Sequence, residues 1–420
     1  MLTAVKINEN ITLNYIPMQK LKTTSVSLYI HRPLDKEESS KNAILPHVLK
    51  RGCKKYPNSQ EIAKYLDNMY GARFSAGIAK KGDDHILCFD AETISDQYAP
   101  NDEKLTEDIT KFVMSIVFDG KEKFDENSFS QEQTNSVQKI RSIINEKRIY
   151  ANYRCQEELA KGDVYAIPRL GYEDKMLKLT AEELYDYYKK IIFNSPIDIY
   201  VCGQADIDNV EKSIREFLKD FHFTPAKMPV SGIIKKNNPV KNITERMDVT
   251  QGKLSMGFLT DISSKSKDYF ALVTANAIFG GGAQSKLFNN VREKLSLCYY
   301  AGSFIDKYKG FMMVNAGIKF ENFEKAYDEI MVQFEEMKHG NISELEFNSS
   351  KGFLQNSLNS YYDDQHSLIS FNLGEKIGGT DLTIDDYKAG IDKVTVDDVK
   401  NVMSKVRLDT VYFLAGKEDK

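Results

Sequence analysis

Three parts of the chain have the hydrophobic pattern of β-strands. Val26, Leu28 and Ile30 alternate with polar residues, which predicts a strand with one buried face. Residues 197–201 and 411–414 are short apolar runs near the ends of two similar stretches of sequence. Runs of this length are typical of buried strands.

Another segment has helical spacing. Apolar residues recur every three or four positions between residues 59 and 70. Asn58 followed by Glu61 resembles a capping box, and Gly71 is suited to the position after the last turn. Because helices and strands come in blocks rather than in strict alternation, we expect an α+β fold with antiparallel sheets covered by helices.

Two stretches of the chain repeat each other, and repetition of this kind constrains the architecture. Ala76-Gly77 and Ala301-Gly302 occupy equivalent places after similar helical segments. Likewise, the stretch that begins at Leu179 is echoed by the stretch that begins at Val394. We therefore predict two homologous halves, each of two similar α/β units.

A change in composition separates the halves. Pro225, Pro229 and Pro239 fall close together among lysines, with no acidic residue between positions 225 and 241. Such a segment buries little apolar surface and tends to run extended. The predicted organisation is an N-terminal half at 1–224, a linker at 225–241 and a C-terminal half at 242–420.

Composition excludes several classes of protein. With 57 Lys and Arg against 61 Asp and Glu, the net charge of −4 offers no basic excess for a nucleic-acid backbone. The N-terminal residues lack the apolar core of a signal peptide, and no apolar run approaches the roughly 20 residues that cross a bilayer. The 5 cysteines are widely spaced, which is typical of reduced thiols and favours a cytoplasmic protein without a membrane partner. They are Cys53, Cys88, Cys155, Cys202 and Cys298.

Common catalytic motifs are missing from the sequence. It contains no P-loop, no G-x-G-x-x-G after a strand and no G-x-S-x-G. None of the 6 histidines has a second histidine at the spacing of a zinc-binding helix. We therefore expect no metal and no cofactor in this chain.

Several runs nevertheless carry a family resemblance. They read NAILPHVLKRGCKKYP, EIAKYLDNMYGARFSAGIAKKGDDHILCF and IFGGGAQSKLFNNVREKLSLCYYAGSF. The chain resembles the insulinase/pitrilysin family of inverted-zincin metallopeptidases over nearly its whole length. Within that family it is most similar to a bacterial branch associated with 5-aminopentanol modification of elongation factor P, whose members resemble inactive subunits.

The resemblance implies a degenerate zinc motif. The family motif is H-x-x-E-H, and its register places the second histidine at His47, the first at Ala43 and the glutamate at Pro46. The remaining ligand, a glutamate in a later helix, falls at Lys139 or within one residue of it. One imidazole cannot hold zinc, and a lysine ammonium would repel it. Alternatively, His47 is simply a packed or hydrogen-bonded helix residue. Pro46 is expected to disturb a helix unless it lies in the first turn.

The second half departs less from the family. Arg292 and Tyr299 match an Arg/Tyr pair that holds the substrate backbone in active members. A guanidinium and a phenol can both donate hydrogen bonds to peptide carbonyls. The alternative is a helix salt-bridge residue followed by a strand aromatic. Upstream, Gly280, Gly281 and Gly282 form a glycine-rich loop that either contacts substrate or simply leads into the next helix.

The resemblance therefore implies a non-catalytic subunit. Such clamps bind unfolded peptide as an added edge strand, and this chain would supply the Arg292/Tyr299 half. A homologous chain with an intact motif would supply the zinc, giving a heterodimeric peptidase in which this chain is inactive alone. The alternative is a non-catalytic accessory protein in elongation factor P modification or peptide maturation.

Overall fold

The structure is a computed structural model that describes residues 2–417. Its contacts divide the chain into two compact units. Unit 1 contains the chain up to Arg141, then Ile167–Val230 and Tyr361–Leu373. Unit 2 contains Ser142–Ala166, Ser231–Ser360 and the chain from Gly374 onward. Within residues 2–417, no helix combines the length and the apolar character needed to cross a membrane.

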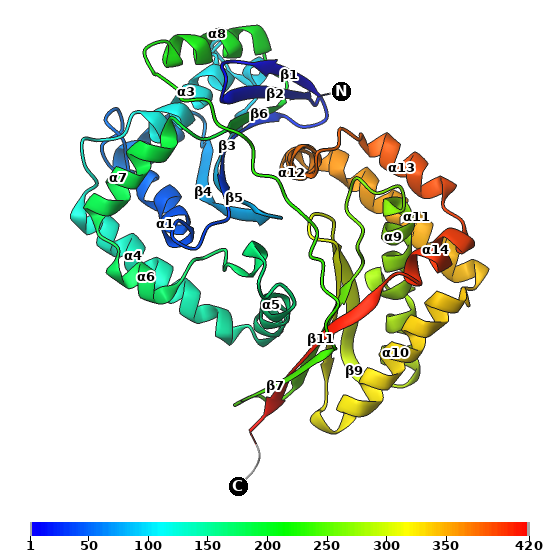
Figure 1. Cartoon of the computed structure of the whole chain (residues 1–420). Coiled ribbons are helices and arrows are strands. Elements are labelled where there is room, and N and C mark those ends of the chain that lie inside the picture. The colour runs from blue at the N-terminus through cyan, green and yellow to red at the C-terminus, as the bar shows by residue number, and fades with distance from the viewer. Residues whose placement is uncertain (1, 418–420) are drawn as a thin grey trace. The chain divides into compact units, whose positions relative to one another are not determined.

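Unit 1 contains one sheet and its helices (Figure 1). The strands are β1 (Thr3–Lys6), β2 (Ile11–Pro17), β3 (Thr23–Pro33), β4 (Arg73–Lys81), β5 (Asp84–Ile94) and β6 (Ile197–Gly203). The helices are α1 (Ser39–Leu49), α2 (Ser59–Asn68), α3 (Leu105–Phe118), α4 (Glu126–Ser142), α6 (Glu173–Lys178), α7 (Ala181–Ile192) and α8 (Ile207–Leu218). The strand order is β1-β2-β6-β3-β5-β4, so β4 is an edge strand.

Unit 2 contains the second sheet. Its strands are β7 (Lys241–Met247), β8 (Gly252–Leu259), β9 (Cys298–Asp306), β10 (Phe311–Ile318) and β11 (Arg407–Gly416). Its helices are α5 (Lys147–Leu159), α9 (Tyr269–Asn276), α10 (Phe323–His339), α11 (Glu344–Ser360), α13 (Ile384–Lys393) and α14 (Val396–Met403), with π-helical segments η4 (Ala277–Gly281) and η5 (Leu287–Lys294). The remaining helix, α12 (Gln365–Gly378), crosses the division between the units. The order β7-β11-β8-β10-β9 makes β9 an edge strand.

The two sheets have the same topology, which confirms two homologous halves of α+β class. Strands β2, β6, β3, β5 and β4 correspond in order to β7, β11, β8, β10 and β9. In both sheets the first of these pairings is parallel and the others are antiparallel. Each half therefore holds a single, mixed sheet, where two similar units with antiparallel sheets were predicted. Ala76 and Ala301 do lie on equivalent edge strands.

Local sequence signals also proved informative. The alternating strand is β3, and the two apolar runs lie in β6 and β11. At the start of α2, Asn58 accepts a hydrogen bond from the backbone N–H of Glu61 at 2.9 Å. The left-handed turn after α2 begins at Tyr70, with φ 58°, and continues at Gly71, with φ 74°. The turn therefore begins one residue earlier than predicted.

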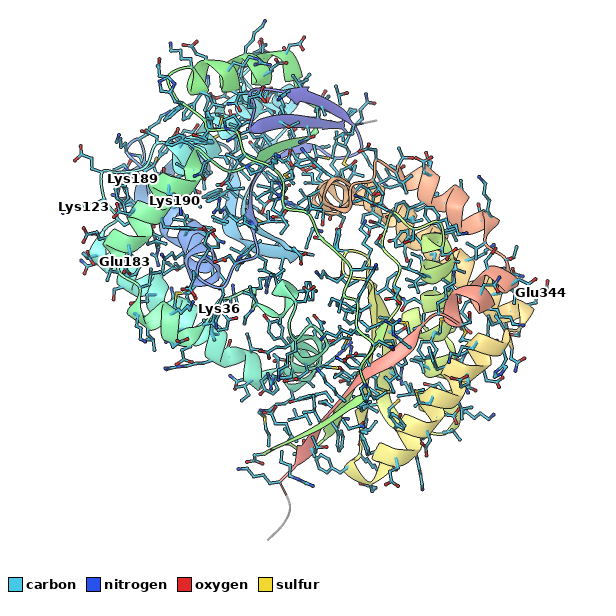
Figure 2. The ribbon with its side chains drawn as sticks, viewed as in Figure 1. Lys36, Lys123, Glu183, Lys189, Lys190 and Glu344 are labelled. Atoms are coloured by element: carbon cyan, nitrogen blue, oxygen red, sulfur yellow. The ribbon has the colours of Figure 1, made fainter. Side chains whose placement is uncertain are left out.

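Helix α7 shows how local chemistry sets helix ends. Thr180 and Glu183 form a reciprocal capping box at its first turn. Glu183 lies at the start of α7, and Lys189 and Lys190 lie near its end, as labelled in Figure 2. This charge order complements the helix dipole. Helix α14, the counterpart of α7 before β11, begins with the same motif at Thr395 and Asp398.

The predicted linker is only partly a surface segment. Residues 221–240 form no helix or strand. Ile234, however, is buried in the core that α5 forms with the second sheet, and its N–H donates to the carbonyl of Lys309 at 2.9 Å. Between the halves, unit 1 ends at residue 230 and unit 2 resumes at residue 231. Residues 142–166 of the predicted N-terminal half belong to unit 2, and residues 361–373 of the predicted C-terminal half belong to unit 1. The units therefore differ from the predicted halves at 1–224 and 242–420.

A charged network is buried in unit 1. His31 Nδ1 lies 2.6 Å from an Asp84 oxygen, and Nε2 lies 3.2 Å from an Asp198 oxygen. All three side chains are at most 1% exposed. Burial alone would lower the pKa of His31, but the charges and hydrogen bonds of Asp84 and Asp198 outweigh it and raise the pKa to about 9.

This network predicts a pH-dependent stability. The folded-state pKa of His31 lies above its ordinary value of 6.5, so its contribution is complete below pH 6.5 and is lost as pH rises through about 9. We expect the free energy of unfolding to fall by about 3 kcal/mol across that window. Urea unfolding at several pH values measures the change. The variant His31→Gln should lose most of this dependence, and His339→Gln, at an exposed position, should retain it.

Candidate functional site

Helix α1, which carries the degenerate motif, is held in place by a chain of hydrogen bonds. Tyr187 on α7 donates to Glu38 at 2.9 Å and to the side-chain oxygen of Asn42 at 2.6 Å. The Asn42 amide in turn donates to Nδ1 of His85 at 3.3 Å. Glu38 also forms an ion pair with Arg32 at 2.6 Å. These buried or half-buried contacts connect α1 to strands β3 and β5 and to α7.

Pro46 lies inside α1. The prediction that it would disturb the helix is wrong, because α1 continues to Leu49 and the Lys50 N–H donates to the Pro46 carbonyl at 3.0 Å. A proline removes one backbone donor from the ladder. The side chains of Glu38 and Asn42 also attach the helix to Tyr187 of α7 through hydrogen bonds.

His47 and Lys139 are brought close enough to interact. His47 is half-buried on α1, and Lys139 is exposed on α4. Burial lowers the pKa of His47, and the positive charges of Lys139 and Lys50 lower it further, while Glu132 opposes the shift. The imidazole therefore lies in a cationic environment. Ala43, one turn earlier on α1, is buried and has no polar side chain.

This set of residues does not fit zinc. A structural or catalytic zinc ion requires at least three protein ligands from imidazole, thiolate or carboxylate. The predicted motif positions offer one imidazole, a methyl group, a proline ring and an ammonium. Within residues 2–417 no cluster of three or more His, Cys, Asp or Glu side chains could hold a metal ion.

Two charged residues beside His47 were missed in the sequence. The Arg51 guanidinium donates from Nε to Glu132 at 2.6 Å. Glu132 and Lys139 are seven residues apart on α4, a spacing that places both on one helix face. That spacing was a usable signal, but Arg51, the partner of Glu132, comes from the turn that follows α1. Together with apolar residues, His47, Arg51 and Glu132 line a pocket of about 380 Å³.

Restoring the ligand types should restore metal binding. We expect the double variant Ala43→His, Lys139→Glu to bind about one zinc ion per chain, because it completes a set of two imidazoles and one carboxylate. Zinc counting by mass spectrometry after dialysis is the measurement. The matched variant Ala43→His, Lys139→Gln lacks the carboxylate and should lose most of the metal. Equal zinc in both variants would show that position 139 is not a ligand position.

In unit 2, the glycine triplet differs from the predicted loop. Gly280 and Gly281 lie at the end of η4, and only Gly282 is extended. None of the three has a positive φ. The backbone approaches β9 closely at Gly280, where a Cβ would lie 2.7 Å from the backbone N of Ser303.

Arg292 lies on η5, close to the start of β9. Its guanidinium carbon is 4.7 Å from the ring centroid of Phe288, and its Nε is 3.5 Å from Glu293. Burial raises the pKa of the Cys298 thiol to about 11, against the opposing charge of Arg292. The Arg292 side chain remains 41% exposed, so its donors can reach a ligand. The π-helical winding of η5 was not predictable from apolar spacing; such winding is frequent at functional sites.

Tyr299 is the extra residue of a β-bulge. Tyr300 pairs with Gly317 and Cys298 pairs with Ile318, which leaves Tyr299 without a partner on β10. Its side chain is 60% exposed. Bulges re-aim side chains at sheet edges, and β9 is such an edge.

The neighbouring Tyr300 has a structural environment instead. The Arg148 guanidinium carbon lies 4.4 Å from the centroid of its ring, and a Cβ on Gly317 would lie 2.3 Å from the same ring. Burial raises the pKa of Tyr300 to about 12. Of the two adjacent tyrosines, Tyr299 is therefore the one available to a ligand.

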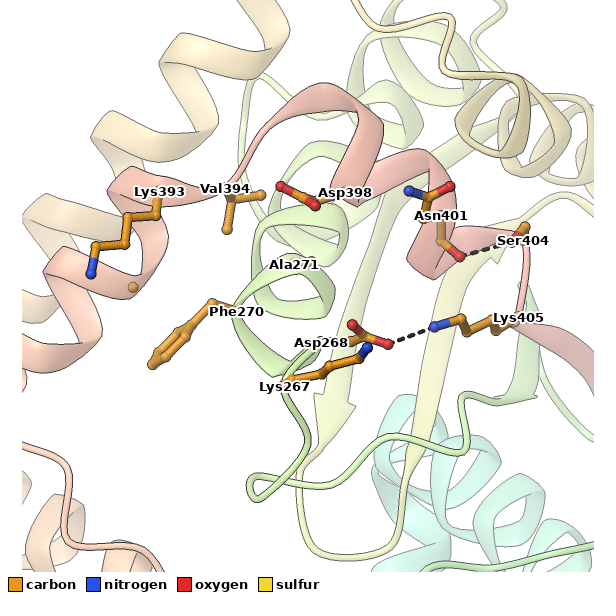
Figure 3. Close-up of a pocket in the computed structure, with 11 residues that line it drawn as sticks. Lys267, Asp268, Phe270, Ala271, Lys393, Val394, Asp398, Asn401, Ser404 and Lys405 are labelled. Carbon is orange, nitrogen blue, oxygen red and sulfur yellow. Dashed lines mark hydrogen bonds and ion pairs between the residues drawn. The ribbon is translucent and has the colours of Figure 1, made fainter.

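A larger pocket of about 610 Å³ lies elsewhere in unit 2, among α9, α13 and α14 (Figure 3). Three of its charged groups are already engaged, because Asp268 pairs with Lys405 at 2.6 Å and Asp398 caps α14. The pocket contains none of the residues predicted to carry chemistry. We do not assign it a function.

The glycine triplet yields a stability prediction. Gly280→Ala should destabilise the protein by about 2 kcal/mol, because its Cβ would clash with the backbone of β9. Gly282→Ala should change stability by less than about 0.5 kcal/mol, since its nearest neighbour, Phe353, is 3.6 Å away. Urea unfolding of both variants is the test. Equal losses would contradict the close approach of η4 to β9.

Comparison with known proteins identifies the family. A family model described as Peptidase M16 inactive domain matches residues 178–354. The probable inactive metalloprotease YmfF of Bacillus subtilis (strain 168) is 35% identical over 411 residues, covering 97% of this chain and 96% of that protein. The uncharacterized zinc protease YmxG of the same organism is 22% identical over 266 residues, covering 63% of this chain and 64% of that protein.

A solved structure agrees with these matches. The crystal structure of a conserved protein from Enterococcus faecalis V583 superposes with a TM-score of 0.92 at 28% identity, covering 100% of this chain and 99% of that chain. The chain belongs to the M16 peptidase family, and the resemblance to insulinases and pitrilysins is confirmed. The elongation factor P branch stays a prediction.

Proposed function

We propose that this protein is a catalytically inactive M16 subunit that binds peptide. The observation that carries the proposal is the contrast between two sites. In unit 1, the positions of the zinc motif hold Ala43, Pro46 and Lys139, which supply neither metal ligands nor a general base. In unit 2, Arg292 and Tyr299 lie at the accessible end of an edge strand.

The edge strand β9 supports the peptide-binding part of the proposal. It pairs on one side only, with β10. An extended peptide can add to such an edge through backbone hydrogen bonds, which gives affinity with little sequence specificity. Arg292 and Tyr299 would donate hydrogen bonds to peptide carbonyls. Of the three glycines, Gly280 packs against the same strand, whereas the nearest neighbours of Gly281 and Gly282 are Asn276 and Phe353.

The proposal includes a partner that carries the zinc. A chain that lacks zinc-binding side chains needs a homologue with an intact H-x-x-E-H motif to form a working heterodimeric peptidase. Bacillus subtilis supports this idea, because it contains relatives named as an inactive metalloprotease and as a zinc protease. A cytoplasmic location also belongs to the proposal and is supported by five free cysteines.

The competing function is that of a non-catalytic accessory protein in elongation factor P modification or peptide maturation. A peptide-binding surface without metal ligands favours this accessory role as much as it favours the role of a peptidase subunit. The two functions differ in whether a complex containing this chain cleaves peptide. Loss of that cleavage in Arg292→Ala would favour the peptidase subunit, and unchanged activity would favour the accessory role.

Peptide binding by the isolated chain tests the proposed surface. We expect a short unstructured peptide, labelled with fluorescein and ending in leucine, to bind and thereby to show an increase in fluorescence anisotropy. The chain should not cleave this peptide when zinc is present. Arg292→Ala and Tyr299→Phe should each weaken binding about fivefold to tenfold, because each removes hydrogen-bond donors. Tyr98→Phe, at an exposed tyrosine of unit 1, is the matched control and should bind normally. Zinc-dependent cleavage by the pure chain would contradict the proposal.

A further inference from the structure

Two cations lie beside the start of the edge strand β9 in unit 2. Tyr300 on β9 pairs with Gly317 on β10, and Gly317 pairs with Lys253 on β8, so the three residues share one face of the sheet. The Lys253 ammonium nitrogen is 5.7 Å from the centroid of the Tyr300 ring, and the guanidinium carbon of Arg148 on α5 is 4.4 Å from it. Arg148, Lys253 and Tyr300, which all belong to unit 2, are called the cationic cluster below.

Gly317 allows the Tyr300 ring to support both cations. The ring passes so close to Gly317 that a Cβ at this position would clash with it. Because position 317 has no side chain, the ring can lie over β10, toward Lys253 on the next strand. Cations near an aromatic ring face are attracted by its quadrupole. Tyr300 therefore positions the cations, and it need not contact a ligand itself.

Neither cation of the cluster is neutralised by an acidic side chain of the described chain, residues 2–417. Lys253 donates to the side-chain oxygen of Gln251, which is uncharged. The two glutamates of α5 pair with Arg154 rather than with Arg148. Burial lowers the pKa of Lys253, and the charge of Arg148 lowers it further, as expected of two like charges close together. The cluster therefore lacks a counter-ion.

A carboxylate on a bound peptide would supply this counter-ion. A peptide that adds to the free edge of β9 places alternate side chains on the face that carries the cluster. Long side chains reach between neighbouring positions of adjacent strands. Arg148 is exposed, so its guanidinium can meet such a side chain from α5 and bind its carboxylate through charge-assisted hydrogen bonds.

We propose that the cationic cluster selects peptides that carry an acidic side chain beside Tyr300. This inference rests on the proposed peptide-binding function and names the class of peptide that β9 prefers. Arg148 binds the carboxylate directly, and Lys253 adds a second positive charge. Backbone contacts along β9 supply affinity for any extended peptide, whereas the cluster distinguishes acidic peptides from neutral ones.

The test compares two forms of one peptide on the full chain. The fluorescein-labelled peptide ending in leucine carries glutamate or glutamine at its centre, with uncharged residues elsewhere and an amidated C-terminus in both forms. Fluorescence anisotropy should show about fivefold tighter binding of the glutamate form in about 50 mM NaCl. In about 500 mM NaCl the ratio of the two affinities should fall below about twofold, because salt screens the charges.

Substitutions of Arg148 separate its charge from a structural role. Arg148→Gln should reduce the ratio of the two affinities below about twofold, whereas Arg148→Lys, which keeps the charge, should retain most of it. Equal weakening of both peptide forms by Arg148→Gln, with an unchanged ratio, would overturn the inference. Lys267→Gln is the matched control, since Lys267 is an exposed lysine of unit 2 outside the cluster, and it should keep the full ratio.

Other outcomes with the unaltered chain are equally decisive. Equal binding of both peptide forms would overturn the inference and leave the proposed function standing. Binding of neither form would overturn the proposed function, and the inference with it.

A third peptide separates the two sources of a carboxylate. It contains the central glutamine and has a free C-terminus, and it should bind no more tightly than the amidated glutamine form. Binding as tight as that of the glutamate form would overturn the assignment to an acidic side chain.

Discussion

The hydrogen bonds that fix helix α1 decide what the first unit can do. Tyr187, Glu38 and Asn42 hold the helix against the sheet, and Asn42 connects it onward to the buried His85. His47 therefore has a fixed position, facing the charges of Lys139 and Glu132. The identity of a few side chains on and around this helix therefore determines whether a metal can bind.

The two sheets show how one topology serves different purposes. Both end in an edge strand at equivalent positions, β4 and β9. Beside β4 the chemistry of the family has been replaced by cations and an apolar pocket. Beside β9 a β-bulge exposes Tyr299, and a π-helical segment brings Arg292 to the start of the strand. On our proposal, one half has lost the metal site while the other half keeps the elements that bind peptide.

Sequence reasoning succeeded where local chemistry decides the structure. The repeat predicted the shared topology, and Asn58 predicted the start of α2, because both signals act through neighbouring residues or a copied segment. It failed where distant contacts decide. The stabilised proline in α1, the single mixed sheet of each half and the exchange of residues 142–166 and 361–373 depend on packing between segments far apart in the chain. The Arg51–Glu132 pair was missed for the same reason.

The central claim is that this chain keeps a peptide-binding surface while another chain supplies the zinc. Isolation of the tagged protein from its own cells tests this claim most directly, with partners identified by mass and zinc counted in the complex. The account predicts a stoichiometric homologue that carries an intact H-x-x-E-H motif and about one zinc ion per pair. A zinc-free homodimer, or zinc bound to this chain alone, would contradict it.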